Sequence, residues 1–251
     1  MQTMFRRTLA ALAVAALSTA AQAQDTPNQG QDQGQGPQPP VIQDSSRPEV
    51  TFNLGVASDY VFRGVSQTDE NPQVFAGADL ASGAFYAGAW GSNVEFAGDE
   101  DTNLEIDLYG GWRPEVAGYG LDFGAIYYLY PGQPDGAEYD FLELKAGASR
   151  AIGPVSGGLY AYWSPEFFAE TGNALYLGAN AAYELTPRAL VTGALGRQDI
   201  DAGGDYTTWN LGLAFSLTDT LTLDGRYWDT DAEAFGDIYD GRLVVGLKAV
   251  F

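Results

Sequence analysis

The last ten residues of the chain alternate between apolar and mixed positions and end on an aromatic ring at Phe251. The apolar positions are Leu243, Val245, Leu247 and Ala249, and the positions between them include Arg242, Gly246 and Lys248. Successive side chains of a β-strand point to opposite faces, so this segment predicts a strand with one oily and one mixed face. Strands of transmembrane barrels alternate in this way and carry aromatic residues at the membrane interface. We therefore expect a transmembrane barrel for which Phe251 is the assembly signal.

Residues 1–23 have the pattern of a secretory signal. Arg6 and Arg7 precede an apolar stretch over 9–17, and Ala21-Gln22-Ala23 forms an A-x-A cleavage site. The apolar stretch is too short to span a bilayer, which argues against a membrane anchor. We expect the signal peptide to be removed during export.

Residues 24–48 are rich in Gln, Pro, Gly and Asp and have almost nothing to bury. Ordering such a segment is not offset by burial, so we expect a disordered periplasmic tail. It would serve as a linker or contact the cell wall. Residues 49–251 suit one large β domain, the barrel itself.

Composition excludes several classes of function. The chain has 12 Lys and Arg against 33 Asp and Glu, a formal net charge of −21, which argues against a phosphate-binding nucleic-acid surface. It has no His and no Cys. This removes His-based catalysis, thiolate nucleophiles and the usual zinc ligands. We therefore expect no enzyme activity and no cofactor.

From Val50 onward the chain divides into about twelve runs of the length that a tilted membrane strand needs. In the run 206–217 the odd positions hold residues such as Trp209, Leu211 and Leu213, and the even ones are small or polar. The predicted strands are 50–63, 72–81, 84–96, 103–113, 120–130, 138–149, 154–164, 173–184, 188–198, 206–217, 220–229 and 240–251.

The oily face of each run carries no charge until its tips, as lipid requires, because a midplane Arg or Lys costs on the order of 2–4 kcal/mol. A soluble barrel would instead scatter Lys and Glu over its exposed face. The connections alternate between short turns and longer acidic loops, the latter at 64–71, 97–102, 131–137, 165–171, 199–205 and 230–239. With the tail in the periplasm, the long loops all fall outside the cell. The prediction is an all-β, antiparallel up-and-down barrel of the Gram-negative outer membrane.

Four segments resemble a known family. They are SDYVFRGVSQT at 58–68, YAGAWGSNV at 86–94, LEIDLYGG at 104–111 and YYLYPG at 127–132. Together they resemble the TorF family of proteobacterial outer-membrane porins, and the likeness covers roughly residues 50–251. The resemblance implies an outer-membrane β-barrel with pore function, and it supplies no catalytic residues and no agreed substrate.

Charged residues with the parity of the inner face are candidates for the lumen. They are Asp59, Arg63, Asp79, Glu105, Asp107, Arg113, Asp122, Glu143, Lys145, Asp224, Arg226, Arg242 and Lys248. Arg63 is interpreted as a pore-lining selectivity charge or, preferably, as a clamp bonded to carboxylates such as Asp59, Asp79 or Glu95. Lumen tyrosines would line a solute path or fill a narrow lumen; these are Tyr128, Tyr130, Tyr160 and Tyr162.

Two acidic patterns have the residue types that hydrolytic or metal-binding sites use. Glu105 and Asp107 share one face of a strand, which permits glycosidase chemistry but favours a lumen charge network. The acidic loops at 199–205 and 229–233 lack the register of an EF-hand, so they are interpreted as solvated loops, with weak divalent binding as the alternative.

Two functions remain open. The first is a passive pore for small hydrophilic solutes with a preference for cations; the second is a closed barrel with a structural or surface-binding role. The expected partners are outer-membrane lipid and lipopolysaccharide, the barrel-assembly machinery acting on the C-terminal strand, and small solutes, but no nucleic acid.

Overall fold

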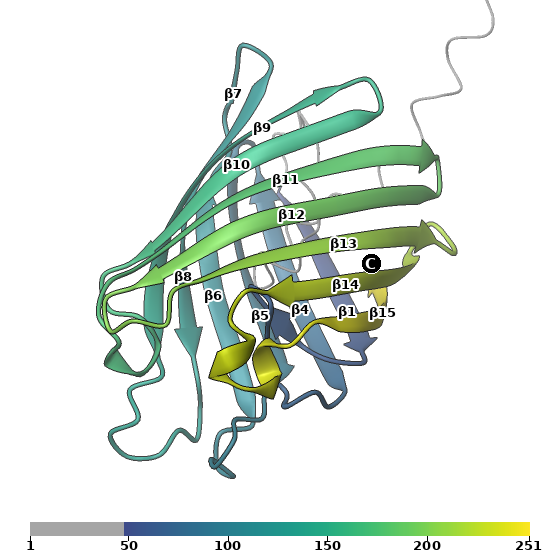
Figure 1. Ribbon diagram of the computed structural model, residues 1–251. Coiled ribbons are helices and arrows are strands. Elements are labelled where there is room, and N and C mark those ends of the chain that lie inside the picture. The colour runs from purple at the N-terminus through teal and green to yellow at the C-terminus, as the bar shows by residue number, and fades with distance from the viewer. Residues whose placement is uncertain (1–47) are drawn as a thin grey trace, which may run out of the picture.

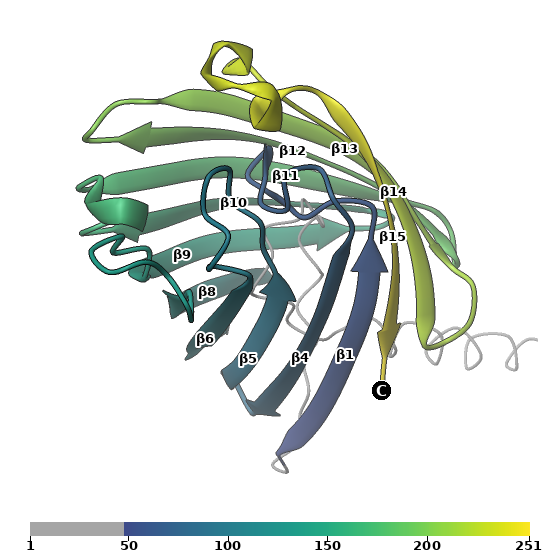
Figure 2. The same ribbon diagram turned by 90° about the horizontal axis from the view of Figure 1, so that it is seen from below.

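The computed structural model describes residues 48–251, which form a single closed antiparallel barrel of twelve strands (Figures 1 and 2). Neighbouring strands follow the chain order, and β1 closes the barrel by pairing with β15. The predicted all-β barrel of about twelve strands is therefore confirmed. The barrel strands are β1 (Glu49–Ala57), β4 (Gln73–Ser82), β5 (Phe85–Asn93), β6 (Leu104–Trp112), β8 (Tyr119–Leu129), β9 (Phe141–Ile152), β10 (Val155–Ser164), β11 (Ala174–Thr186), β12 (Ala189–Ile200), β13 (Tyr206–Ser216), β14 (Leu221–Thr230) and β15 (Arg242–Val250).

Six short elements accompany the twelve barrel strands: β2 (Val61–Phe62), β3 (Val65–Ser66), β7 (Glu115–Val116), and the 3-10 helices η1 (Phe168–Glu170), η2 (Glu233–Phe235) and η3 (Asp237–Tyr239). Of these, β7 pairs with β8 and extends the barrel sheet. None of the helices in residues 48–251 is long and apolar enough to cross a membrane. The expectations for the signal peptide, and for the tail up to residue 47, lie outside the described residues.

Exposure alternates along the strands with period two. In β13, Leu211 is 58% exposed while its neighbours Asn210 and Gly212 are buried. The same alternation holds in β1, where Phe52 and Leu54 face outward and Asn53 faces inward. The outward positions form an apolar surface around the barrel. Its exposed side chains include Val56, Val74, Leu80, Leu108, Trp112, Leu144, Leu177, Leu195, Trp209, Leu213, Phe215, Leu243 and Val245.

The barrel has two unlike ends. At one end, here called the turn end, strands are joined by short connections such as 153–154 and 187–188. At the other, the loop end, the connections include 94–103, 130–140 and 231–241. The chain enters β1 and leaves β15 at the turn end, as the sequence predicted for an even number of strands.

The predicted first strand, 50–63, is wrong in its second half. β1 ends at Ala57, and the chain then leaves the wall and returns to it only at Gln73, the direct cross-strand partner of Ala57. Residues 58–72, here called the inward hairpin, contain the paired strands β2 and β3. Tyr60 and Phe62 still alternate with Asp59 and Arg63 in this segment, which is why the sequence pattern extended the first strand to residue 63.

Bulky inward side chains are placed opposite glycines on the neighbouring strand. Tyr109 is the direct partner of Gly88, and a Cβ added to Gly88 would lie 2.5 Å from the tyrosine ring. A ring can lie along the wall only where the facing residue has no side chain. Five other direct pairs share this arrangement: Phe75 with Gly55, Trp90 with Gly77, Tyr86 with Gly111, Tyr160 with Gly178 and Arg226 with Gly212.

Candidate functional site

The inward hairpin crosses the barrel lumen at the loop end. The side chains of its central part, residues 59–68, are buried or half-buried: Tyr60, Val61 and Arg63 are at most 1% exposed, and Thr68 is 0% exposed. In Figure 2 the dark-blue segment after β1 lies in front of the strands of the opposite wall. A loop that is buried to this degree inside a barrel determines what space remains for a solute.

Arg63, at the tip of the hairpin, joins it to the opposite wall. Its guanidinium donates to both carboxylate oxygens of Glu143 on β9, at 2.8 and 2.7 Å, and to Oε1 of Gln198 on β12, at 2.9 Å. Both members of the ion pair are 1% exposed. Such a fork-to-fork pair fixes the geometry of both partners. The clamp interpretation of Arg63 thus fits the contacts, but the proposed partners Asp59, Asp79 and Glu95 were wrong.

Aromatic rings complete the surroundings of this guanidinium. Its carbon lies 4.4 Å from the ring centre of Tyr176 on β11 and 5.0 Å from that of Tyr162 on β10. Phe62 of the hairpin itself is 4.6 Å away. These distances are within the range of cation–π attraction, which strengthens where water is excluded.

The turn at the tip has little tolerance for other residues. Arg63 and Gly64 both have positive φ, 50° and 88°, which a two-residue hairpin turn with the primed geometry requires. A non-glycine residue in this region is held there at a cost, roughly 1–2 kcal/mol. A Cβ on Gly64 would lie 2.3 Å from Oγ1 of Thr208, so the tip also contacts β13.

The base of the hairpin is held by Asp59. Its carboxylate accepts hydrogen bonds from Ser66 at 2.7 Å and Thr68 at 2.8 Å, and it forms an ion pair with Arg242 of β15 at 3.1 Å. Arg242 also reaches Glu70, at 3.3 Å. The hairpin is therefore a braced element and not a loosely packed loop.

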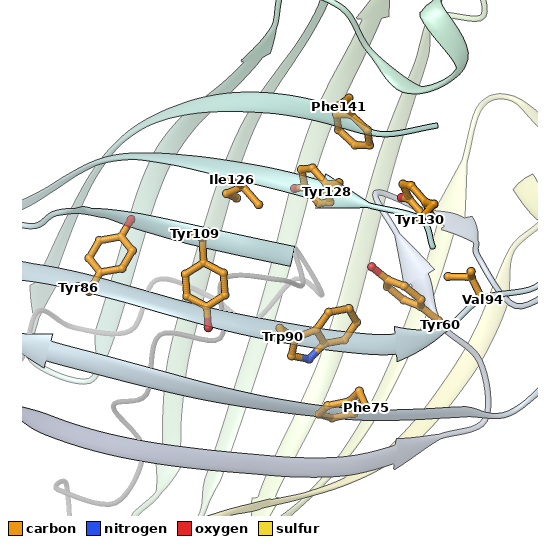
Figure 3. Packing of buried hydrophobic residues seen from close by; sticks show 10 residues of the cluster. All are labelled: Tyr60, Phe75, Tyr86, Trp90, Val94, Tyr109, Ile126, Tyr128, Tyr130 and Phe141. Carbon is orange, nitrogen blue, oxygen red and sulfur yellow. The ribbon is translucent and has the colours of Figure 1, made fainter. Parts of the chain in front are cut away.

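A cluster of buried aromatic residues fills the lumen between the hairpin and the wall from β4 to β9 (Figure 3). Tyr60 contacts Trp90 edge to face, with ring centres 5.5 Å apart, and its hydroxyl donates to Glu105 at 2.6 Å. Phe62 likewise contacts Tyr128, whose hydroxyl donates to Glu143 at 3.1 Å. This half of the lumen is packed like a protein core.

On its other flank the hairpin packs against the last three strands. Val61 clusters with Trp228 and Val244, and Val65 clusters with Tyr206 and Ala232. Taken with the contacts above, side chains of every barrel strand from β5 to β15 meet the inward hairpin. The hairpin therefore reaches the wall on nearly every side of the lumen at this level.

The turn-end half of the lumen is more open and carries charge of both signs. Asp122 forms ion pairs with Lys145 at 2.6 Å and Arg113 at 3.2 Å, and Arg113 remains 33% exposed. Asp224 pairs with Arg226 at 3.2 Å, and Asp224 is 28% exposed. These groups would meet any solute that enters from the turn end.

The charged residues proposed for the lumen divide between these two levels. Eight are at most 9% exposed and belong to the hairpin, its partners or the enclosed wall: Asp59, Arg63, Asp79, Glu105, Asp107, Glu143, Lys145 and Arg226. Arg113, Asp122, Asp224, Arg242 and Lys248 are partly exposed. That any of them lines a conducting path stays a prediction.

Gln198, Tyr176 and Tyr86 were not singled out from the sequence. The hydroxyl of Tyr86 donates to Asp122 at 2.9 Å, and the guanidinium carbon of Arg113 lies 4.0 Å from the centre of the Tyr86 ring. The parity of each residue within its strand would have placed it in the lumen, but no sequence signal pairs Gln198 with Arg63, 135 positions earlier.

The acidic residues of the lumen and loops show no metal-site arrangement. Glu105 and Asp107 are buried and share the inward face of β6. In residues 48–251 no group of three or more Asp or Glu side chains could hold a metal ion. At the loop end, hydrogen bonds from Thr102 hold the pKa of Asp99 below its usual range.

A family model described as "Bacterial protein of unknown function (Gcw_chp)" matches residues 42–251. No curated protein sequence matches the chain significantly. Among solved structures, the barrel is similar to the KdgM porin, with a TM-score of 0.59 and 8% identity over 80% of this chain and 99% of that one. It is also similar to the NanC porin, with a TM-score of 0.51 and 8% identity over 80% and 98%. Likeness at this identity shows the fold.

Proposed function

The chain belongs to the Gcw_chp family of bacterial proteins of unknown function, and from its geometry we propose that it is an outer-membrane pore for small hydrophilic solutes. The inward hairpin forms the narrowest point of this pore. The apolar outer surface supports placement in a bilayer, because outward residues such as Leu211 are well exposed and uncharged. The porin-like fold supports the same placement.

The observation that carries the proposal is the contrast between the two halves of the lumen. A charged, partly exposed half opens to the turn end, and a braced hairpin limits the loop end. Selectivity in such a pore comes from width and fixed charge. The acidic loops would raise the local concentration of cations, so we propose a preference for cations.

Removal of the hairpin tests the proposal directly. Ala57 and Gln73 are direct cross-strand partners, so a short turn containing Asn-Gly can replace residues 58–72 and leave the barrel register intact. In a planar bilayer, the wild type should give small single-channel steps and the shortened variant clearly larger ones. Equal steps from both proteins would show that the hairpin is not the narrowest point.

A closed barrel is the second candidate, and the continuous ring of contacts around the hairpin favours it. In this case the aromatic cluster and the ion pairs would seal the lumen, and the protein would act through its surface. The wild type would then give no steps, while the shortened variant would conduct. The same pair of recordings therefore separates the two functions.

The remaining assignments follow from the pore proposal. We propose that the protein is not an enzyme, since the full sequence contains no His and no Cys. We also propose that the protein is related to the TorF porins and that its signal peptide is cleaved. Its proposed partners are lipopolysaccharide and the barrel-assembly machinery. Fractionation of outer and inner membranes tests the location.

A further inference from the structure

We propose that the surroundings of Arg63 on the far wall are a binding site for guanidinium-bearing solutes, and that Arg63 is a tethered occupant of this site. The site is built by Glu143, Gln198, Tyr162 and Tyr176, from four consecutive strands, β9 to β12. The proposal rests on the proposed pore, which supplies the route by which a solute reaches the site.

The chemistry of the site is specific for a planar cation. The carboxylate of Glu143 receives two parallel hydrogen bonds, which match the fork of a guanidinium and not the point charge of an ammonium. The amide oxygen of Gln198 accepts a third hydrogen bond from the same nitrogen that reaches Glu143. Tyr162 and Tyr176 offer ring faces to the cation.

The occupant reaches this site from the other side of the barrel. Arg63 belongs to the segment that follows β1, whereas the four site residues lie on β9 to β12, opposite β1 in the ring of strands. Its backbone is in the left-handed region, with φ 50°, where arginine is unfavourable compared with glycine. The hairpin therefore holds a strained residue in order to place one guanidinium in a carboxylate-and-ring cage.

Because all four site residues belong to the wall, the site persists when Arg63 is withdrawn. A free solute with the same head group would compete with the tethered one, and it would need to displace the hairpin tip to bind. Binding would then be coupled to the width of the lumen. The width of a cation-preferring pore would thereby depend on whether a guanidinium-bearing solute is bound.

The test uses methylguanidinium as the probe and N-methylurea as its uncharged counterpart of similar shape. Binding to the detergent-solubilised barrel is measured by titration calorimetry, and folding is checked by heat-modifiable migration. Arg63→Gly empties the site and keeps the turn, since glycine readily adopts positive φ. Methylguanidinium should bind this variant saturably and at least roughly tenfold more tightly than the wild type, where the tether competes.

Two controls locate the binding. Adding Glu143→Gln to Arg63→Gly removes the fork partner, and affinity should fall roughly tenfold to a hundredfold, as for loss of charged hydrogen bonds. N-methylurea should bind neither variant measurably. If Arg63→Gly does not fold, the same titration is made on the barrel whose residues 58–72 are replaced by the short turn, which leaves all four site residues in place.

A folded variant that binds no methylguanidinium, or binds N-methylurea equally well, would overturn the site and leave Arg63 as a structural link. Titration does not require conduction, so this result is separate from the conductance test. A wild type that is silent in the bilayer, with an emptied site that binds methylguanidinium, would refute the pore and retain the site.

Discussion

The ring of Tyr109 lies over the backbone of Gly88, its direct cross-strand partner, and the tyrosine hydroxyl donates to Asp79. A methyl group at position 88 would therefore collide with the ring and displace a buried hydrogen bond. We expect Gly88→Ala to lower the free energy of unfolding by about 1–3 kcal/mol, as for overpacking of a filled core. Urea titration of the barrel in vesicles, followed by tryptophan fluorescence, measures it.

Gly225 on β14 provides the matched control. A Cβ added there meets no atom within 4 Å. Gly225 is on the outer face of the strand, because its two neighbours, Asp224 and Arg226, point inward. Gly225→Ala should leave stability unchanged or raise it slightly, since alanine restricts the unfolded chain. Equal loss in both variants would mean that the cost at Gly88 comes from the strand backbone and not from Tyr109.

The positions and faces of the strands could be predicted because each strand has an apolar environment on one face and the lumen on the other. Its apolar and polar residues must therefore alternate with period two. In β13 the exposed residues Trp209, Leu211 and Leu213 are those that the alternation selected. The inward hairpin was not predictable in this way. Tyr60 and Asp59 keep the parity of a wall strand, although the chain has already left the wall at Ala57.

One local signal did mark the turn inside the predicted strand. Arg63-Gly64 stands between Phe62 and Val65 with glycine in the second position, as a two-residue turn requires, but alternation on both sides outweighed it. The site on the far wall had no local signal, because Arg63 and Glu143 are 80 positions apart. Long-range pairing of this kind depends on the closure of the barrel.

Leu211 tests the orientation of the strands. It is 58% exposed near the middle of β13, so Leu211→Arg should cost about 2–4 kcal/mol in a bilayer or block assembly. Ala214→Arg is the control, because Ala214 faces inward beside Asp224, its cross-strand partner. Urea titration in vesicles compares the two, and similar losses would contradict the assignment of the faces.

Phe251 tests the assembly signal. It is 70% exposed, and its backbone exchanges hydrogen bonds with Phe52 at the closure of the barrel. Phe251→Asp should reduce the yield of heat-modifiable barrel in the membrane, because the aromatic anchor at the interface is lost. Phe235→Asp, at a similarly exposed phenylalanine in the loop-end helix η2, should assemble normally. Normal yield from Phe251→Asp would refute the signal.

The acidic loops predict the sign of ion selectivity. Exposed carboxylates surround the loop end, among them Asp69, Glu70, Glu100, Asp101, Glu166, Glu170, Asp201, Asp205, Asp231, Glu233 and Asp237. Their field extends about 8 Å at physiological salt, so any current should be carried more by K⁺ than by Cl⁻, and less so in molar salt. Reversal potentials across a salt gradient measure this preference, and anion selectivity would contradict it.

Substitution of loop carboxylates and changes of pH test whether these carboxylates cause the preference for cations. Glu100→Gln with Asp101→Asn should weaken it, whereas Asp99 is left intact because its carboxylate holds the turn through Thr102. Acidification should weaken selectivity as carboxylates near pH 4 become protonated. Hydrogen bonds from Thr102 lower the pKa of Asp99, and a backbone hydrogen bond from Thr207 lowers the pKa of Asp231, so both groups keep their charge to lower pH than an ordinary aspartate. A residual preference should therefore persist below pH 4 in the wild type and become smaller, without disappearing, when Asp99→Asn is introduced, which the same reversal potentials would detect.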